Sequence, residues 1–118
     1  MPKATEEEKS LRQKAIQDAT RQAIEVPFAV MQSALSSMDV ILAMAETGNP
    51  NSVSDAGVGA VCARSSVIGA FLNVKINAAG YDDKEYTRVI LEKGRAIENK
   101  AIEKEKEILE LVNAKIGV

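Results

Sequence analysis

The sequence predicts an all-α fold, an antiparallel bundle of about four helices that homodimerisation completes. Apolar residues recur at spacings of three and four, capping residues precede several of these segments, and β-hairpin signals are absent. Charge is also uneven: residues 1–25 carry ten charged side chains and residues 82–118 carry seventeen, whereas the 56 residues between them carry five. This distribution predicts a buried centre wrapped by solvated helices.

The first half of the chain predicts two helical segments. Thr5 and Glu8 form a capping box ahead of a helix over residues 6–25. Pro27 then suits either the first turn of a second helix or a kink in one continuous helix. An apolar seam follows it: Phe28, Met31, Leu35, Met38, Leu42 and Ala45. Gly48 is expected to end this helical stretch.

Two further helices are predicted in the second half. Ser52 with Asp55 forms a second capping box, which starts a helix that runs to about residue 77. Asp82 with Glu85 is expected to cap the last helix, which reaches nearly to the C-terminus. The inward residues of that helix are predicted to be Tyr86, Ile90, Ile97, Ala101, Ile108 and Leu111.

A stripe of small and polar residues follows one side of the third predicted helix. Its members are Asp55, Gly59, Cys62, Ser66, Gly69, Asn73 and Asn77. The stripe has two interpretations, tight packing against another helix with the amides bonded to backbone, or the wall of a ligand groove. Capping alone also explains Asp55, so both interpretations stay open.

Three other features have simple structural explanations. Cys62 is expected to be a small core residue. Arg64, on an apolar helix, needs either a carboxylate partner such as Asp39 or a ligand anion. The lysines of the last helix are expected to form a solvated face: Lys100, Lys104 and Lys106.

Composition excludes several chemistries. With 118 residues the chain fits one small domain. It has no histidine and one cysteine, which excludes an imidazole base, an internal disulfide and a cysteine zinc site. A net charge of −2 and few aromatic residues predict no nucleic-acid binding. Polar residues interrupt both apolar stretches, so we expect no membrane span and a cytoplasmic protein.

Two motifs resemble the C-terminal, cyclodeaminase/cyclohydrolase domain of the formiminotransferase-cyclodeaminase family. The first is the run Gly48-Asn49-Pro50-Asn51-Ser52-Val53-Ser54-Asp55, and the second is Asn73-Val74-Lys75-Ile76-Asn77. The opening of the chain and the segment Ile24-Glu25-Val26-Pro27 look like the middle of that family's domain. The resemblance covers essentially the whole chain.

The resemblance implies an enzyme of folate one-carbon metabolism, usually a homodimer, without metal or redox cofactor. Members convert 5-formimidoyltetrahydrofolate to 5,10-methenyltetrahydrofolate and ammonia, as ammonia lyases, or hydrolyse the methenyl bridge as cyclohydrolases. Intramolecular attack by N10 of the folate, with a carboxylate moving protons, suits a protein without histidine. A non-catalytic helical oligomerisation module remains the alternative from another class.

The resemblance also implies which residues meet the substrate. The motif positions that would contact folate are Asn49, Ser54, Asp55, Asn73 and Asn77. Lys3, Arg64 and Lys75 are candidates for the glutamate tail. The family's Gly-Gly-Gly-Ser-type loop and its proposed proton acceptor have no counterpart here. We therefore expect residues 1–118 to form a single partial cyclodeaminase-like domain, with the catalytic acid outside this chain.

Overall fold

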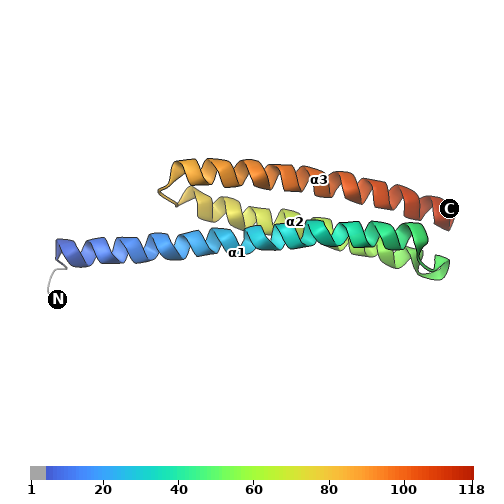
Figure 1. The fold of residues 1–118 in the computed structure, drawn as a ribbon, viewed down its shortest axis with the longest axis horizontal. Helices are drawn as coiled ribbons and strands as arrows, with labels where there is room; N and C mark the ends of the chain where they lie inside the picture. The colour runs from blue at the N-terminus through green and yellow to red at the C-terminus, as the bar shows by residue number, and fades with distance from the viewer. Residues whose placement is uncertain (1–4) are drawn as a thin grey trace.

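The computed structural model describes residues 5–118 as three long antiparallel α-helices joined by short connections (Figure 1). Helix α1 spans Glu6–Thr47, the 3-10 turn η1 spans Pro50–Ser52, α2 spans Val53–Ala79 and α3 spans Lys84–Ile116. The all-α prediction is confirmed. The prediction of four helical segments is wrong, because α1 runs without interruption through Pro27.

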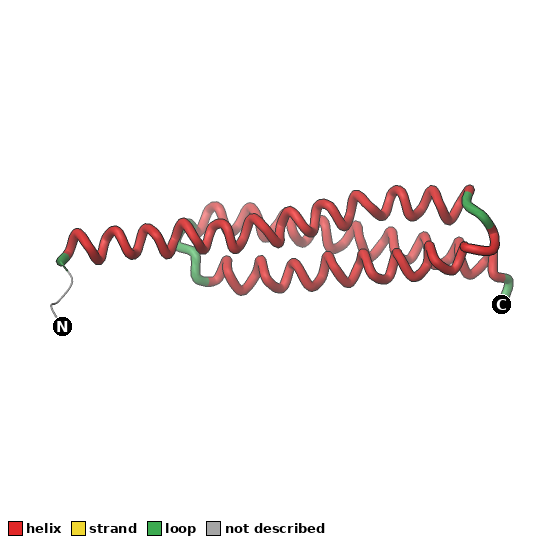
Figure 2. Tube along the Cα trace, turned by 90° about the horizontal axis from the view of Figure 1, so that it is seen from below, coloured by secondary structure: helices red, strands yellow, loops and turns green. Residues whose placement is uncertain are grey.

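Helix α1 is much longer than the helix beside it. Its 42 residues extend about 63 Å at 1.5 Å per residue, against about 40 Å for the 27 residues of α2. The first turns of α1 therefore project beyond the turn that joins α2 to α3 (Figure 2). The molecule is accordingly an elongated rod, 71 × 26 × 19 Å, with a radius of gyration of 20.0 Å.

The core follows the predicted seams. Met31, Met38 and Ala45, one helical heptad apart on α1, are buried, and Phe28, Leu35 and Leu42 pack partly buried against them. On α3, Ile90, Ala101 and Ile108 are buried as predicted, while Tyr86, Ile97 and Leu111 line the rim of the core. The 3.6-residue pattern alone located both faces because each helix buries one apolar stripe.

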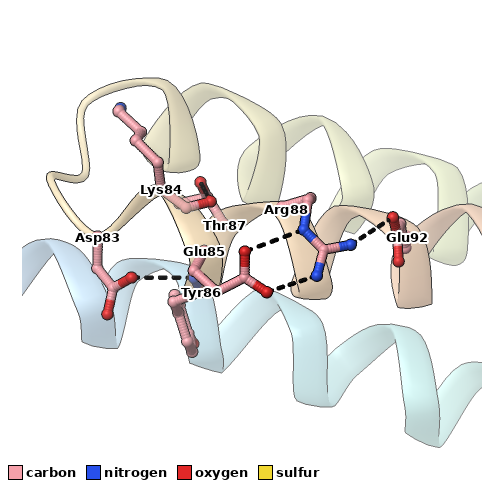
Figure 3. Close-up of polar contacts among 7 residues, drawn as sticks. All are labelled: Asp83, Lys84, Glu85, Tyr86, Thr87, Arg88 and Glu92. Atoms are coloured by element: carbon pink, nitrogen blue, oxygen red, sulfur yellow. Dashed lines mark hydrogen bonds and ion pairs between the residues drawn. The ribbon is translucent and has the colours of Figure 1, made fainter.

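Helix ends confirm one predicted cap and correct two. The capping box of Thr5 and Glu8 is present in both directions. Ser52 makes no side-chain cap; instead Asn49 caps η1, and its side chain accepts from the Asn51 N–H at 2.9 Å. Asp83, not Asp82, caps α3 by accepting from the Tyr86 N–H at 3.0 Å (Figure 3). In both corrections the capping side chain belongs to a nearby Asn or Asp residue, and both residue types favour helix N-caps.

The first turns of α3 carry an exposed network of charges. Arg88 donates to both carboxylate oxygens of Glu85 and to Glu92 on the next turn (Figure 3). The Arg88 guanidinium holds the pKa of Glu85 below its ordinary value. Because all three side chains are exposed, this network orders the helix surface and adds little to stability.

Ion pairs connect α3 to both other helices. Arg64 on α2 pairs with Glu105 at 2.5 Å, so it has the carboxylate partner that its position required, although not Asp39. Asp39 on α1 instead pairs with Lys104, also at 2.5 Å. Lys104 is thus an interhelical contact, against the prediction of a solvated face. At the far end, Lys115 donates to the Ala45 and Glu46 carbonyls at the C-terminus of α1.

Pro27 leaves a carbonyl of α1 without its usual donor. A proline has no N–H, so the Ala23 carbonyl cannot receive the i to i−4 hydrogen bond. The Asn77 side chain of α2 donates to that carbonyl at 3.3 Å, and to the Asn73 carbonyl of its own helix at 2.8 Å. One amide nitrogen therefore supports helix continuity in α1 and fixes α2 beside it.

Gly94 permits the closest approach between α2 and α3. A Cβ at this position would lie 2.4 Å from Cε1 of Phe71, the largest of the fully buried side chains. No other glycine in a described helix would place a Cβ as close to a neighbouring side chain. Glycine is therefore required here by space, at a cost in helix propensity of about 1 kcal/mol.

We predict that Gly94→Ala destabilises the protein although alanine favours helix. The methyl group collides with the Phe71 ring, and overpacking of this kind costs about 1–3 kcal/mol. Urea unfolding measures the change. The matched test is Phe71→Leu, which frees space: the double variant should lose less than the sum of the single losses. Strict additivity would contradict the assignment.

We also predict that Asn77→Ala lowers the free energy of unfolding by about 1 kcal/mol in the native background. The same substitution should have little effect in a Pro27→Ala background, because that change restores a backbone N–H that can bond to the Ala23 carbonyl. Chemical denaturation of the four proteins gives the coupling energy. Equal losses in both backgrounds would show that Asn77 acts through something other than the Ala23 carbonyl.

Candidate functional site

A groove lies between α1 and α2, and no residue of α3 lines it. Its volume is about 780 Å³. Helix α1 contributes Ala19, Gln22, Ala23, Val26, Pro27 and Val30; α2 contributes Ser66, Gly69, Ala70, Asn73 and Asn77. We call this the amide groove, after its two asparagines.

A second groove of about 720 Å³ continues the first along the same pair of helices. It shares Val26, Val30 and Ser66 with the amide groove and extends to Ile41 and Gly59. Among residues 5–118, no acidic or basic side chain lines either groove. The surface therefore suits a flat, largely apolar group that is anchored by a few hydrogen bonds.

The predicted stripe lies along this groove system, apart from Asp55. Gly59, Cys62, Ser66, Gly69, Asn73 and Asn77 all line one of the two grooves. Each interpretation of the stripe agrees with one of its asparagines. Asn77 bonds to neighbouring backbone, as the packing interpretation requires, whereas Asn73 is exposed on the groove wall. Cys62 is exposed, so its prediction as a core residue is wrong. The small residues around it line a groove.

The structure separates the five predicted substrate-contacting residues into two groups. Asn49, Ser54 and Asp55 lie at the junction of η1 and α2 and are exposed. Asp55 precedes Asn73 by 18 residues, about 27 Å along α2. Within one chain these groups therefore do not meet at a single small ligand.

The residues at the η1–α2 junction have local roles of their own. The Asn49 side chain is engaged by the Asn51 N–H, and Asp55 lies in the first turn of α2, where a negative charge is favourable. Ser54 lines a third groove of about 340 Å³ between α2 and α3, together with Val58 and Leu109. This groove is the nearest concave surface to the first motif.

Two of the three basic residues that were candidates for the glutamate tail contact other side chains of this chain. Arg64 is paired with Glu105, and the Lys75 ammonium lies 4.3 Å from the centre of the Phe71 ring. Lys3 falls outside the described residues. Within residues 5–118, no group of three or more histidine, cysteine, aspartate or glutamate side chains is placed to hold a metal ion.

Sequence reasoning missed the α1 side of the groove. Gln22, Val26 and Pro27 form one wall of it, and the sequence pattern had assigned none of them a role in a site. Helix α1 carries a second periodic series of small residues, on a different side from the core seam that begins at Phe28. This series could have indicated the α1 wall of the groove. A site between two helices requires both series, and only the one on α2 was recognised.

A cluster of polar contacts near the α2–α3 turn sets the geometry at one end of the amide groove. Gln17 on α1 accepts from the Asp82 N–H at 2.9 Å and donates to the Gly80 carbonyl at 3.5 Å. Close by, the Arg21 guanidinium lies 4.3 Å from the centre of the Tyr86 ring and pairs with Glu25. These contacts hold α1 against the turn between α2 and α3, beside Asn77.

Two helices are long and apolar enough to cross a membrane, by length and composition alone: Glu6–Thr47 and Pro50–Ala79. The polar residues within these helices therefore do not exclude a membrane span by this criterion, whereas the sequence had predicted that they would. The core helix of a water-soluble protein can have the same length and composition. In the most apolar 18-residue stretch of each helix, only 17% and 39% of the residues are buried. Much apolar surface therefore lies uncovered on α1 and α2.

Comparison with known proteins agrees with this set of motifs. A methenyltetrahydrofolate cyclohydrolase of Methylorubrum extorquens is 35% identical over 117 residues, 99% of this chain and 56% of the relative. A formimidoyltransferase-cyclodeaminase of Rattus norvegicus is 35% identical over 91 residues, 75% of this chain and 17% of that protein. The chain thus spans about half the length of the first relative and a smaller share of the second.

The family comparison covers most of the chain. The sequence pattern of the formiminotransferase-cyclodeaminase family matches residues 1–96, which include α1, α2 and the first turns of α3. A further formimidoyltransferase-cyclodeaminase, of Dictyostelium discoideum, is 30% identical over 84% of this chain. On this evidence the chain belongs to the formiminotransferase-cyclodeaminase family.

Proposed function

We propose that this chain is part of a folate one-carbon enzyme and that the amide groove holds the pterin portion of a tetrahydrofolate derivative. The supporting observation is an uncharged groove with two exposed amides, Asn73 on α2 and Gln22 on α1, in a chain of this family. A pterin offers a flat ring with hydrogen-bonding edges. A groove whose walls are apolar and whose polar groups are few suits that shape.

For the reaction, we propose the cyclodeaminase step, which converts 5-formimidoyltetrahydrofolate to 5,10-methenyltetrahydrofolate and ammonia. The cyclodeaminase and cyclohydrolase reactions take place at the same folate carbon, so the binding surface can serve either one. The cyclohydrolase reaction has equal support, because one relative is named for it and others are named for the cyclodeaminase. Release of ammonia distinguishes the two.

The groove positions substrate without supplying acid–base chemistry. Among the described residues no carboxylate lines it, and the nearest carboxylate of the first motif, Asp55, lies about 27 Å from Asn73 along α2. Proton transfer needs a group within hydrogen-bonding reach of the reacting atom. We therefore propose that the proton acceptor comes from outside this chain.

The two asparagines have different roles in this proposal. The Asn77 side-chain nitrogen already donates to the Ala23 and Asn73 carbonyls, so Asn77 holds the groove in shape. The Asn73 side chain makes no hydrogen bond among the described residues and is exposed. Asn73 is accordingly available to a ligand, as is Gln22 on the α1 wall, which is also exposed.

We predict that the chain binds 5,10-methenyltetrahydrofolate without turning it over. Calorimetric titration measures binding, and hydrogen exchange should show protection near residues 66–77. Asn73→Ala should weaken binding about 10-fold, which corresponds to the loss of one hydrogen bond. Asn99→Ala, on exposed α3, is the matched control and should bind normally.

Three outcomes would count against the proposal. No binding by a folded chain would favour a non-catalytic helical module. A loss of binding on Asp55→Ala together with normal binding by Asn73→Ala would move the site to the junction of η1 and α2. Turnover of either folate by the chain alone would contradict the proposal that the proton acceptor comes from outside these residues.

A further inference from the structure

One end of the molecule brings the C-terminal ends of two helices together. Helices α1 and α3 both run antiparallel to α2, so they are parallel to each other and end on the same side (Figure 1). The last carbonyl groups of a helix carry a partial negative charge. Helix α1 has no basic residue in its last turn and has Glu46 there, so its own sequence supplies nothing to offset that charge.

Lys115 of α3 supplies the missing cation. It lies in the last turn of α3, and its ammonium group donates to the Ala45 carbonyl at 2.5 Å and to the Glu46 carbonyl at 2.7 Å. The Met44 carbonyl accepts from the Gly48 N–H at 2.7 Å. Three of the last four carbonyls of α1 therefore have a donor, and for two of them the donor is one side chain of another helix.

The same turns of α3 also pack on the start of α2. A Cβ at Gly57 would lie 3.3 Å from Cγ1 of Val112 and 3.6 Å from Cδ2 of Leu109. The third groove lies here, with Ser54 on the α2 side and Asn113 among its residues on the α3 side. The last turns of α3 thus contact both helices that carry the connection between α1 and α2, and they form one wall of that groove.

The connection itself has little else to hold it. We call residues 48–52 the corner, and all five of them are exposed. In the described chain, the hydrogen bonds that corner amides donate go to Met44 or to Asn49 within the corner. A segment with exposed backbone and few buried contacts opens locally at low cost in free energy. The order of the corner therefore depends on its two anchors, the last turn of α1 and the buried Val53 of α2.

We propose that the last turn of α3 is a strap that holds the corner closed, and that Lys115 is the residue through which it acts. While the ammonium group bonds to the last carbonyls of α1, the corner and the adjoining Ser54 keep their place beside α3. When that contact is lost, the part-buried Ala45 carbonyl loses its donor, and the last turn of α1 opens together with the corner. The strap concerns the backbone of the corner, so it does not depend on the folate proposal.

The first experiment measures amide hydrogen exchange by NMR in the full chain. Lys115→Met keeps the length of the side chain and removes its charge and its donors. We expect amides of residues 45–52 to exchange about 10-fold faster in this variant. The Asp82 amide, which bonds to Gln17 at the opposite end of the molecule, should keep its native rate, because it can open without breaking the strap.

Two further variants separate the strap from a general loss of stability. Lys115→Arg keeps the positive charge and the donors, so it should restore the native exchange rates of the corner. Lys106→Met removes an exposed lysine of the same helix that makes no hydrogen bond or ion pair in the described chain, and it should leave the corner unchanged.

The second experiment uses salt. The attraction between an exposed ammonium group and two helix ends is screened by ions. Raising the NaCl concentration should therefore speed exchange of the Gly48 amide in the native chain and in Lys115→Arg, and much less in Lys115→Met. Salt changes the intrinsic exchange chemistry equally in all three proteins, so the difference between them reports on the strap.

Any of four results would overturn the strap. The first is native exchange of the corner in Lys115→Met. The second is equal acceleration of the corner and of the Asp82 amide, which would mean a loss of global stability only. The third is a failure of Lys115→Arg to restore the native rates. The fourth is an equal response to salt in Lys115→Met and in the native chain.

Discussion

The fold depends on α1 continuing through Pro27. A proline inside a helix removes one hydrogen bond and favours a break at that point. Here the Asn77 amide supplies the missing donor to the Ala23 carbonyl, so the helix continues and α2 is fixed beside it at the same place. The Gln17 contacts with the α2–α3 turn hold α1 at a second point, six residues before Ala23. The groove between α1 and α2 has its shape because these contacts set the position of both walls.

The two faces of α1 have different neighbours. Its core seam packs on α2 and α3, and Gly94 of α3 lets those two helices approach each other closely at the Phe71 ring of α2. The opposite face, from Ala19 to Ser37, lines the two grooves beside α2, and most of its side chains there are exposed.

Helix type, the core seams and the Thr5 cap could be predicted from sequence because each depends on local spacing. Three features depend on tertiary contacts and could not. Pro27 suits a new helix as well as a continuous one, and only the Asn77 contact decides between them. Cys62 is exposed because none of the three described helices covers its side of α2. The motif around Asp55 and the motif around Asn73 are joined by one straight helix, which separates them instead of bringing them together.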